Sequence, residues 1–248
     1  MPKAPEHEIV YGIRPVQESL SSARPCFRLH VKDLTGERAP LAAEARGRGI
    51  KVVVTSAAEL GKLAQGGNHQ GVVGLFRPYE YADFHTVLGS LGDKDDALIL
   101  ALDSVKDPGN LGAILRTAAA AGVDLVVFPQ DRAAGVTAAV MRASAGGADH
   151  VAVARVVNLT RALEELKKAG FWVFGTAADA KTTLWNVDLR GKACWVLGDE
   201  AQGIRRLVRD RCDEVCRIPM PGGFESLNVA AATAICLFES VRQRQPAL

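Results

Sequence analysis

The sequence has no hydrophobic run long enough to cross a membrane. Its longest purely aliphatic stretch covers residues 97–102, far short of the roughly 18–20 residues that a bilayer requires. Near the start, Glu6 and Glu8 interrupt the region in which a secretory signal would need continuous apolar residues. We therefore expect a cytoplasmic protein without a transmembrane helix.

Cysteines are few, and their spacing does not favour disulfides or a metal site. There are five, an odd number, and none forms a C-x-x-C pair. Cys212 and Cys216 are four positions apart, but no histidine or second cysteine pair completes a zinc site with them. We expect reduced core thiols and no metal.

The chain also lacks a strong excess of charge of either sign. Thirty lysines and arginines against 28 aspartates and glutamates give a net charge of +2, which neither requires nor excludes a nucleic-acid partner. Arginines gather in two places, at Arg205, Arg206, Arg209 and Arg211, and at Arg242 and Arg244. Each cluster is equally compatible with a phosphate-binding patch and with a solvated helix face.

The composition is that of a folded protein. Hydrophobic residues make up 48% of the 248 residues and charged residues 23%, with a mean hydropathy of +0.07. Such a chain can bury a sizeable core, which excludes a disordered chain, a collagen and a disulfide-held miniprotein. Its length favours two unequal domains.

Hydrophobic periodicity divides the chain into three parts. Residues 8–77 alternate short helical and strand patterns, which predicts a small α/β domain over residues 1–77. Residues 78–96 contain Pro78, two glycines and a DKDD charge run, which indicates a linker with one helix over 84–91. The larger domain then covers residues 97–248.

The predicted strands of the larger domain are apolar on both faces, as strands of a covered parallel sheet should be. They lie at 98–102, 125–128, 151–156, 171–174 and 194–197. Helical patterns lie at 111–121, 136–145, 159–169 and 204–211, and a final long helix covers 226–241. This alternation predicts an α/β domain with a parallel sheet.

Three segments of this domain carry unusual residues. In LDSVKDPGNLGAILRTAAAAG, residues 102–122, we expect Asn110 to cap an alanine-rich helix, and Arg116 to need a partner among apolar neighbours. In WVLGDEAQGI, residues 195–204, Gly198 and Gly203 bound a turn that contains Glu200. Because Ile204 and Arg205 stand where a phosphate loop needs Lys and Ser or Thr, this turn is no such loop.

The third segment is RIPMPGGFESLNVAAATAICLFE, residues 217–239. A strand ends near Pro219, a glycine-rich loop follows, and Ser226 is placed to cap the last helix. Asn228 would then lie inside an apolar helix, where asparagine is disfavoured. Such a residue usually bonds the backbone or faces a site.

Together the three segments resemble the SpoU/TrmH family of RNA ribose 2′-O-methyltransferases, within the wider SPOUT superfamily, over residues 97–243. At the front, IVYGIRPVQESL (residues 9–20) and HQGVVG (residues 69–74) resemble a small RNA-binding domain that is similar to the ribosomal-protein L30e fold. Over the whole chain, the nearest resemblance is to the bacterial branch that methylates a guanosine ribose in large-subunit (23S) ribosomal RNA.

The resemblance implies a fold and a cofactor that composition alone does not show. It implies an α/β domain with a deep C-terminal trefoil knot, a homodimer with sites at its interface, and S-adenosylmethionine held by the knot loops without a metal. The residues that match the family's cofactor loops are Thr176, Ala177, Gly198, Gly203, Ile218, Met220, Ser226 and Leu227.

The resemblance also assigns catalytic residues, with the arginine supplied by the partner subunit. The matching residues are Asn110, Arg116, Glu200, Ser226 and Asn228. Since arginine stays protonated, we expect Arg116 to lower the pKa of the ribose hydroxyl and bind the adjacent phosphate rather than act as a base. Asn110 and Asn228 would orient the arginine and the ribose, and Glu200 would hold the loop or the arginine.

Three other functions are alternatives to this reading. A transfer RNA methyltransferase of the same family would keep all three motifs, but often lacks the front domain. A non-catalytic RNA-binding protein would keep the knot and lose the motif residues, which are all present here. A metabolic α/β enzyme using another nucleotide lacks its phosphate loop in this chain.

Overall fold

The computed structural model describes residues 7–21, 24–131, 133–199 and 202–245. Their contacts divide the chain into two compact units. The first comprises Met1–Glu80 with Val136–Arg142, and the second comprises Tyr81–Gly135 with Ala143–Leu248. No described helix is both long and apolar enough to cross a membrane.

The first unit is built on a four-stranded sheet in the order β1-β4-β2-β3, in which only the β2–β3 pair is parallel. Its elements are β1 (Glu8–Tyr11), α1 (Ile13–Ser21), β2 (Cys26–Val31), α2 (Arg38–Gly47), β3 (Lys51–Val54), α3 (Ala57–Leu63) and β4 (Val72–Phe76). The alternation of short helices and strands expected over residues 8–77 is present. Strand β1 was not predicted from the hydrophobic pattern, because only one of its four residues, Val10, is buried.

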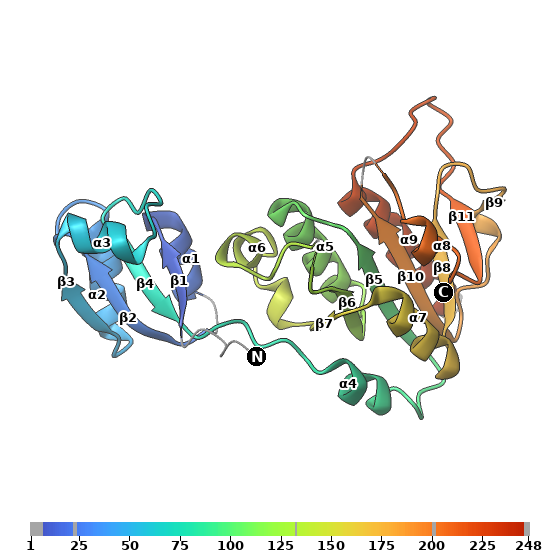
Figure 1. The fold of residues 1–248 in the computed structure, drawn as a ribbon, viewed down its shortest axis with the longest axis horizontal. Helices are drawn as coiled ribbons and strands as arrows, with labels where there is room; N and C mark the ends of the chain where they lie inside the picture. The colour runs from blue at the N-terminus through green and yellow to red at the C-terminus, as the bar shows by residue number, and fades with distance from the viewer. Residues whose placement is uncertain (1–6, 22–23, 132, 200–201, 246–248) are drawn as a thin grey trace. The chain divides into compact units, whose positions relative to one another are not determined.

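The second unit is built on a seven-stranded parallel sheet in the order β7-β6-β5-β10-β8-β11-β9 (Figure 1). Its strands are β5 (Ala97–Asp103), β6 (Leu125–Pro129), β7 (Ala152–Val156), β8 (Trp172–Thr176), β9 (Thr182–Thr183), β10 (Lys192–Gly198) and β11 (Glu214–Arg217). All seven residues of β5 are buried, as a strand covered on both faces requires. The predicted parallel α/β sheet is confirmed.

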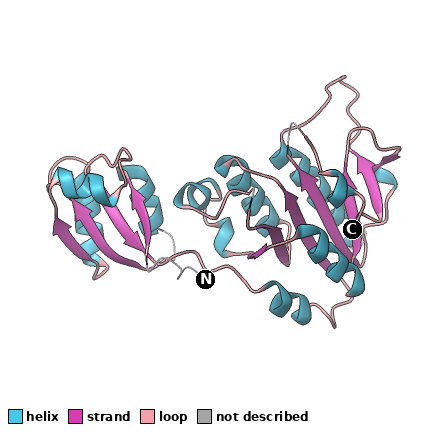
Figure 2. Cartoon of the chain, viewed as in Figure 1, coloured by secondary structure: helices cyan, strands magenta, loops and turns pink. Residues whose placement is uncertain are grey.

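Helices cover both faces of this sheet (Figure 2). They are α4 (Phe84–Ser90), α5 (Pro108–Ala120), α7 (Leu159–Lys168), α8 (Arg206–Arg209) and α9 (Val229–Arg244), and α6 (Ala138–Ala143) and the short 3-10 helices η1 (Gly147–Asp149) and η2 (Leu184–Asn186) complete the chain. The helices α4, α7 and α8 share one apolar core with the sheet. On the other face, the buried Trp195 ring of β10 donates through Nε1 to Ser240 of α9 (2.8 Å).

The segment around α4 packs into the second unit. Phe84 and Leu91, at its two ends, are nearly fully buried in the core of that unit. The main-chain N–H of Ala82 donates to the carbonyl of Val153 (2.8 Å), which ties the segment to β7. Asp83 caps the helix by accepting from the N–H of Thr86 (2.8 Å).

Two helix starts differ from the expectation. Asp107, not Asn110, caps α5: its Oδ1 accepts from the N–H of Asn110 (2.7 Å). Asn228, not Ser226, caps α9, and its Oδ1 accepts from the N–H of Ala230 (3.0 Å). An aspartate with proline at the next position is as good a cap signal as asparagine, and capping explains why asparagine is tolerated beside an apolar helix.

Candidate active site

Three loops meet at one edge of the second unit's sheet. Strands β10, β8 and β11 are neighbours and run parallel, so their carboxyl ends lie together. The chain leaves these ends through residues 177–181, 199–205 and 218–228. In open parallel sheets the crevice beyond the carboxyl ends of the strands is the usual ligand site.

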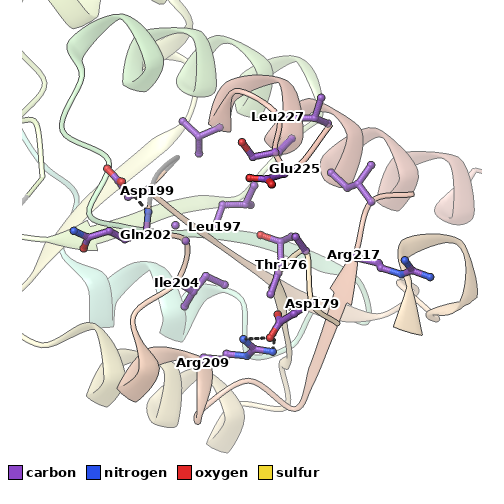
Figure 3. Close-up of a pocket in the computed structure, with 18 of the residues that line it drawn as sticks. Thr176, Asp179, Leu197, Asp199, Gln202, Ile204, Arg209, Arg217, Glu225 and Leu227 are labelled. Carbon is purple, nitrogen blue, oxygen red and sulfur yellow. Dashed lines mark hydrogen bonds and ion pairs between the residues drawn. The ribbon is translucent and has the colours of Figure 1, made fainter. Parts of the chain in front are cut away.

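The three loops enclose a cavity of about 540 Å³ (Figure 3). All eight residues expected to contact a cofactor line it: Thr176, Ala177, Gly198, Gly203, Ile218, Met220, Ser226 and Leu227. Aliphatic side chains of Leu197, Ile204 and Val229 form part of the wall, and Asp199, Gln202, Arg217 and Glu225 add polar groups. The cavity therefore combines glycines and apolar side chains with several polar and charged side chains.

The loop after β10 folds back on its own strand, which leaves no room for a side chain at Gly198. A Cβ there would lie 2.1 Å from the carbonyl carbon and oxygen of Gly203. Asp199 and Gly203 exchange main-chain hydrogen bonds of 3.1 and 2.8 Å, and Gly203 adopts a φ of +64°. Both glycines are thus needed by backbone geometry.

An ion pair between a buried carboxylate and a partly exposed arginine holds the end of this loop. Asp103, at the carboxyl end of β5, is 0% exposed, and its Oδ2 accepts from the main-chain N–H of Arg205 (2.9 Å). Its Oδ1 accepts from Nε of the same arginine (2.7 Å). The sequence reasoning missed this pair, although a carboxylate at the end of a fully apolar strand was the available signal.

A second ion pair lies in the cavity wall. The Arg209 guanidinium donates to both carboxylate oxygens of Asp179, at 3.0 and 3.1 Å (Figure 3). These hydrogen bonds lower the pKa of Asp179 below its ordinary value. The contact joins the loop after β8 to helix α8 beside the cavity.

The first and third motifs are joined by a direct contact. Nδ2 of Asn228 donates to Oδ1 of Asn110 over 2.9 Å, between residues 118 positions apart in the chain. Because Leu227 and Val229 line the cavity, this bond places the start of α5 beside the cofactor loops. Asn110 and Asn228 therefore belong to one constellation.

Arg116 stands apart from these groups. It lies on α5 with an exposed side chain, so the partner that we expected for a buried charge is not required. It is absent from the described lining of the cavity. Its backbone packs closely on η1, since a Cβ at Gly147 would lie 2.6 Å from the Arg116 Cα. Glu200, the remaining expected site residue, lies outside the described residues.

Most arginines of the two sequence clusters have protein partners. Besides Arg205 and Arg209, Arg211 pairs with Glu164 (2.6 Å) and Arg242 with Glu239 (2.8 Å). Arg244 donates to the main-chain carbonyls of Ala97, Leu189 and Gly191, which anchors the end of α9. These contacts are compatible with the reading of the clusters as parts of the fold, and phosphate binding by them stays a prediction.

The cysteines are free thiols in the structure. Burial raises the pKa of Cys212 and of Cys216 to about 12 and that of Cys26 to about 11, so none of these three is a thiolate near neutral pH. Among the described residues, histidine, cysteine and acidic side chains nowhere gather as three or more potential metal ligands.

Both parts of the chain match known families. Residues 97–238 match the SpoU rRNA Methylase family, and residues 9–82 match the family described as RNA 2′-O ribose methyltransferase substrate binding. The 23S rRNA (guanosine-2′-O-)-methyltransferase RlmB of Xylella fastidiosa strain Temecula1 is 41% identical over 249 residues, covering 96% of this chain and 98% of that protein. The RlmB of Coxiella burnetii is 41% identical over 240 residues, covering 95% and 96%.

Solved structures agree with this chain in fold. The AdoMet-bound rRNA methyltransferase from Sinorhizobium meliloti superposes with a TM-score of 0.69 at 26% identity, covering 97% of this chain and 89% of that one. A TrmH/SpoU tRNA modifying enzyme from A. aeolicus has a TM-score of 0.55 at 29% identity and covers only 64% of this chain. The ribosomal RNA enzymes thus match a longer part of this chain than the transfer RNA enzyme does.

Proposed function

The chain belongs to the SpoU rRNA methylase family, and on that premise we propose that it transfers a methyl group from S-adenosylmethionine to the 2′-hydroxyl of a guanosine ribose in 23S ribosomal RNA. The observation that carries the proposal is the cavity at the strand ends. Its lining contains every residue that the family resemblance assigns to the cofactor, drawn from three separate loops.

The cavity suits S-adenosylmethionine in size and chemistry. Its 540 Å³ lies within the roughly 300–1,000 Å³ typical of small-molecule sites. Leu197, Ile204 and Val229 offer an apolar wall for an adenine, and the loop backbones offer donors and acceptors at its edge. The carboxylates of Asp199 and Glu225 suit a cofactor that carries a positive charge. When bound, this cofactor supplies a methyl group on a sulfonium, ready for in-line transfer.

The chain's own residues then have three tasks. The loops after β8, β10 and β11 hold the cofactor and exclude water from it. Asn110 and Asn228, joined to each other, orient the ribose from the edge of the cavity. Arg116 stabilises the developing alkoxide of the 2′-hydroxyl and binds the neighbouring phosphate, since a positioned cation favours charge that appears in the transition state. Ser226 and Glu200 shape the loops around these groups.

A homodimer accounts for the position of Arg116. Its side chain is exposed on α5, and it is not part of the described cavity lining of its own chain. An arginine donated from a second copy of the chain would complete each site. This arrangement predicts that two inactive proteins, Arg116→Ala and a cofactor-loop variant, regain activity when mixed.

The remaining family features complete the proposal. Residues 1–77 form an L30e-like RNA substrate-binding domain, residues 78–96 a linker and residues 97–248 the methyltransferase domain with a trefoil knot. The match of residues 9–82 to a substrate-binding family supports the first assignment. The trefoil knot rests on the resemblance to the family.

Methyl transfer tests the proposal. Purified protein is incubated with labelled S-adenosylmethionine and either undermodified 23S ribosomal RNA or transfer RNA, and the product is digested to nucleosides. We expect label in 2′-O-methylguanosine from the ribosomal RNA. Label in transfer RNA alone would overturn the substrate, and cofactor binding without any transfer would favour a non-catalytic RNA-binding protein.

A further inference from the structure

The sheet of the first unit has one face covered by helices and one that is only partly covered. Strand neighbours Val10, Gly74, Leu29 and Val52 form a row on the covered face, where α1 and α2 complete the core. On the opposite face, α3 packs on Val73 through Leu60 and Ala64. The next row of side chains on that opposite face lies two residues along each strand from the row that contains Val73.

This second row runs straight across all four strands. Ile9 of β1 is paired with Leu75 of β4, Leu75 with Arg28 of β2, and Arg28 with Lys51 of β3. Phe27 is the extra residue of a bulge beside Arg28. Ile9 is 36% exposed and Phe27 is 43% exposed, and Arg28 and Lys51 are exposed too. We call these five residues the basic face.

Two positive charges lie opposite each other on the basic face. Side chains directly across neighbouring strands are close, and like charges there oppose pairing. Within the described residues, neither Arg28 nor Lys51 has a carboxylate within ion-pair distance, whereas Arg38 and Arg48 of the same unit pair with Asp33 and Glu44. Burial, and then the charge of Arg28, lowers the pKa of the neighbouring His30. A bound polyanion would remove this repulsion.

The other members of the basic face favour nucleic acid over other polyanions. Phe27 presents a 43% exposed ring, with the His7 ring tilted against it at a centroid distance of 5.0 Å, and Ile9 and Leu75 present an apolar strip next to the two cations. Sheet faces that combine aromatic and basic side chains bind unpaired RNA by stacking bases on the ring and pairing phosphates with the cations.

We propose that the basic face binds an unpaired segment of the substrate RNA, with Phe27 stacking on a base and Arg28 and Lys51 contacting phosphates. This inference rests on the proposed function for its choice of RNA. It gives the first unit a defined contact surface that is separate from the methyl-transfer cavity. The basic face should therefore govern RNA affinity and leave the chemical step unchanged.

Salt dependence of RNA binding tests the charge contacts. Full-length wild type and the double variant Arg28→Gln with Lys51→Gln are titrated with undermodified 23S ribosomal RNA at 50 to 200 mM salt. Losing two phosphate contacts should flatten the slope of log K against log salt by about 1.4–1.8 and weaken binding roughly tenfold at low salt. The matched control is Arg14→Gln with Arg46→Gln, which removes two exposed cations from α1 and α2, on the covered side of the sheet.

A control variant that lowers slope and affinity as much as the test variant would overturn the proposal, because any two cations would then suffice. So would a test variant with the wild-type slope. The thermal midpoint of the test variant should equal or exceed that of the wild type, since a like-charged pair has been neutralised. A lower midpoint together with an unchanged slope would show that the two side chains serve only the fold.

Phe27 is tested separately from the charges. Phe27→Ala should weaken RNA binding about 5–100-fold without changing the salt slope, and Phe27→Tyr should keep wild-type affinity. Methyl transfer by the same proteins should show a raised KM for RNA with kcat and the KM for S-adenosylmethionine unchanged. If wild type methylates the RNA but all these variants bind like wild type, the basic face is wrong and the proposed function stands. If wild type binds RNA but transfers nothing, the proposed function fails instead.

Discussion

The two units of this molecule differ in how they present functional groups. In the second unit, the cavity lies where parallel strands end, and the loops that leave these strands shape its wall, one of them folded back at Gly198 and Gly203. In the first unit, the basic face consists of side chains that stand on strands. A wall shaped by loops depends on the path of the loop, whereas a face built from side chains depends on their charge and aromaticity. Substitutions in the second unit should therefore act by changing the shape of a loop, and those in the first unit by removing a charge or a ring.

The largest expected effect comes from Arg116, the cation that we assign to the reacting hydroxyl. Arg116→Ala should lower kcat by about 10³-fold or more, as expected when a group that stabilises transition-state charge is removed. Because the side chain is exposed and absent from the described cavity lining, the Kd for S-adenosylmethionine should stay within about twofold. Single-turnover kinetics and calorimetry measure the two quantities. An active Arg116→Ala protein would remove the arginine from the mechanism.

The second-largest effect should come from a substitution that displaces the backbone of the loop after β10. Gly198→Ala places a methyl group 2.1 Å from the Gly203 carbonyl, so the loop must move. We expect S-adenosylmethionine binding to weaken by at least about 100-fold, the equivalent of roughly 3 kcal/mol. The matched control is Gly222→Ala, because a Cβ at Gly222 meets only the Phe224 ring at 3.8 Å. Equal affinity of the two variants would show that the shape of the loop after β10 does not matter.

Replacing Asp103, the buried carboxylate that holds the loop after β10, should lower both the stability of the protein and its affinity for S-adenosylmethionine. Asp103→Ala leaves the Arg205 guanidinium and main-chain N–H without their acceptor, and breaking a buried pair typically costs about 3–5 kcal/mol of unfolding free energy. Since Arg205 keeps partial access to water, we expect a loss near the lower limit, together with weaker S-adenosylmethionine binding. Chemical denaturation measures the first effect.

The side-chain replacement Asp103→Asn separates packing from charge. Asparagine keeps an acceptor for the Arg205 N–H but loses the ion pair. It should fold more stably than Asp103→Ala and still bind the cofactor more weakly than wild type. If Asp103→Asn binds S-adenosylmethionine as wild type does, the ion pair serves stability alone.

The smallest effect concerns the buried thiols. Burial raises the pKa of Cys212 and Cys216 to about 12, so the folded protein keeps both protonated where the unfolded chain ionises, above a pKa of about 9. Stability from these groups is complete below pH 9 and declines between pH 9 and 12. Native protein at pH 8 should react with a thiol reagent far more slowly than urea-unfolded protein. Rapid native labelling of these cysteines would contradict their burial.

The sequence predicts the sheet of the second unit well, because strands buried on both faces leave long apolar runs such as ALILAL in β5. It predicts edge elements poorly. Strand β1 buries one residue of four, and α8 is only four residues long where a helix over 204–211 was expected. At the start of α8, the main-chain N–H of Arg205 donates to the carboxylate of Asp103. These residues are 102 positions apart, so no local sequence pattern reveals the contact.

In the candidate site, too, some features could be predicted from the sequence and others could not. The resemblance to the family, carried by three motifs, identified residues that line one cavity. It assigned caps to Asn110 and Ser226, whereas Asp107 and Asn228 perform these tasks. Choosing among several good capping residues in one loop depends on the path of the backbone, which sequence alone leaves open. The bond between Asn228 and Asn110 is likewise a product of the fold.

Hydrogen exchange with S-adenosylmethionine alone tests the central claim that the loops after β8, β10 and β11 form the cofactor site. Mass spectrometry of peptides from the full-length protein would compare exchange with and without saturating cofactor. We predict slower exchange in peptides covering 176–181, 198–205 and 218–228, and no change over residues 8–76. Saturated binding with unchanged exchange in those three loops, or with protection concentrated in the first unit, would contradict the account.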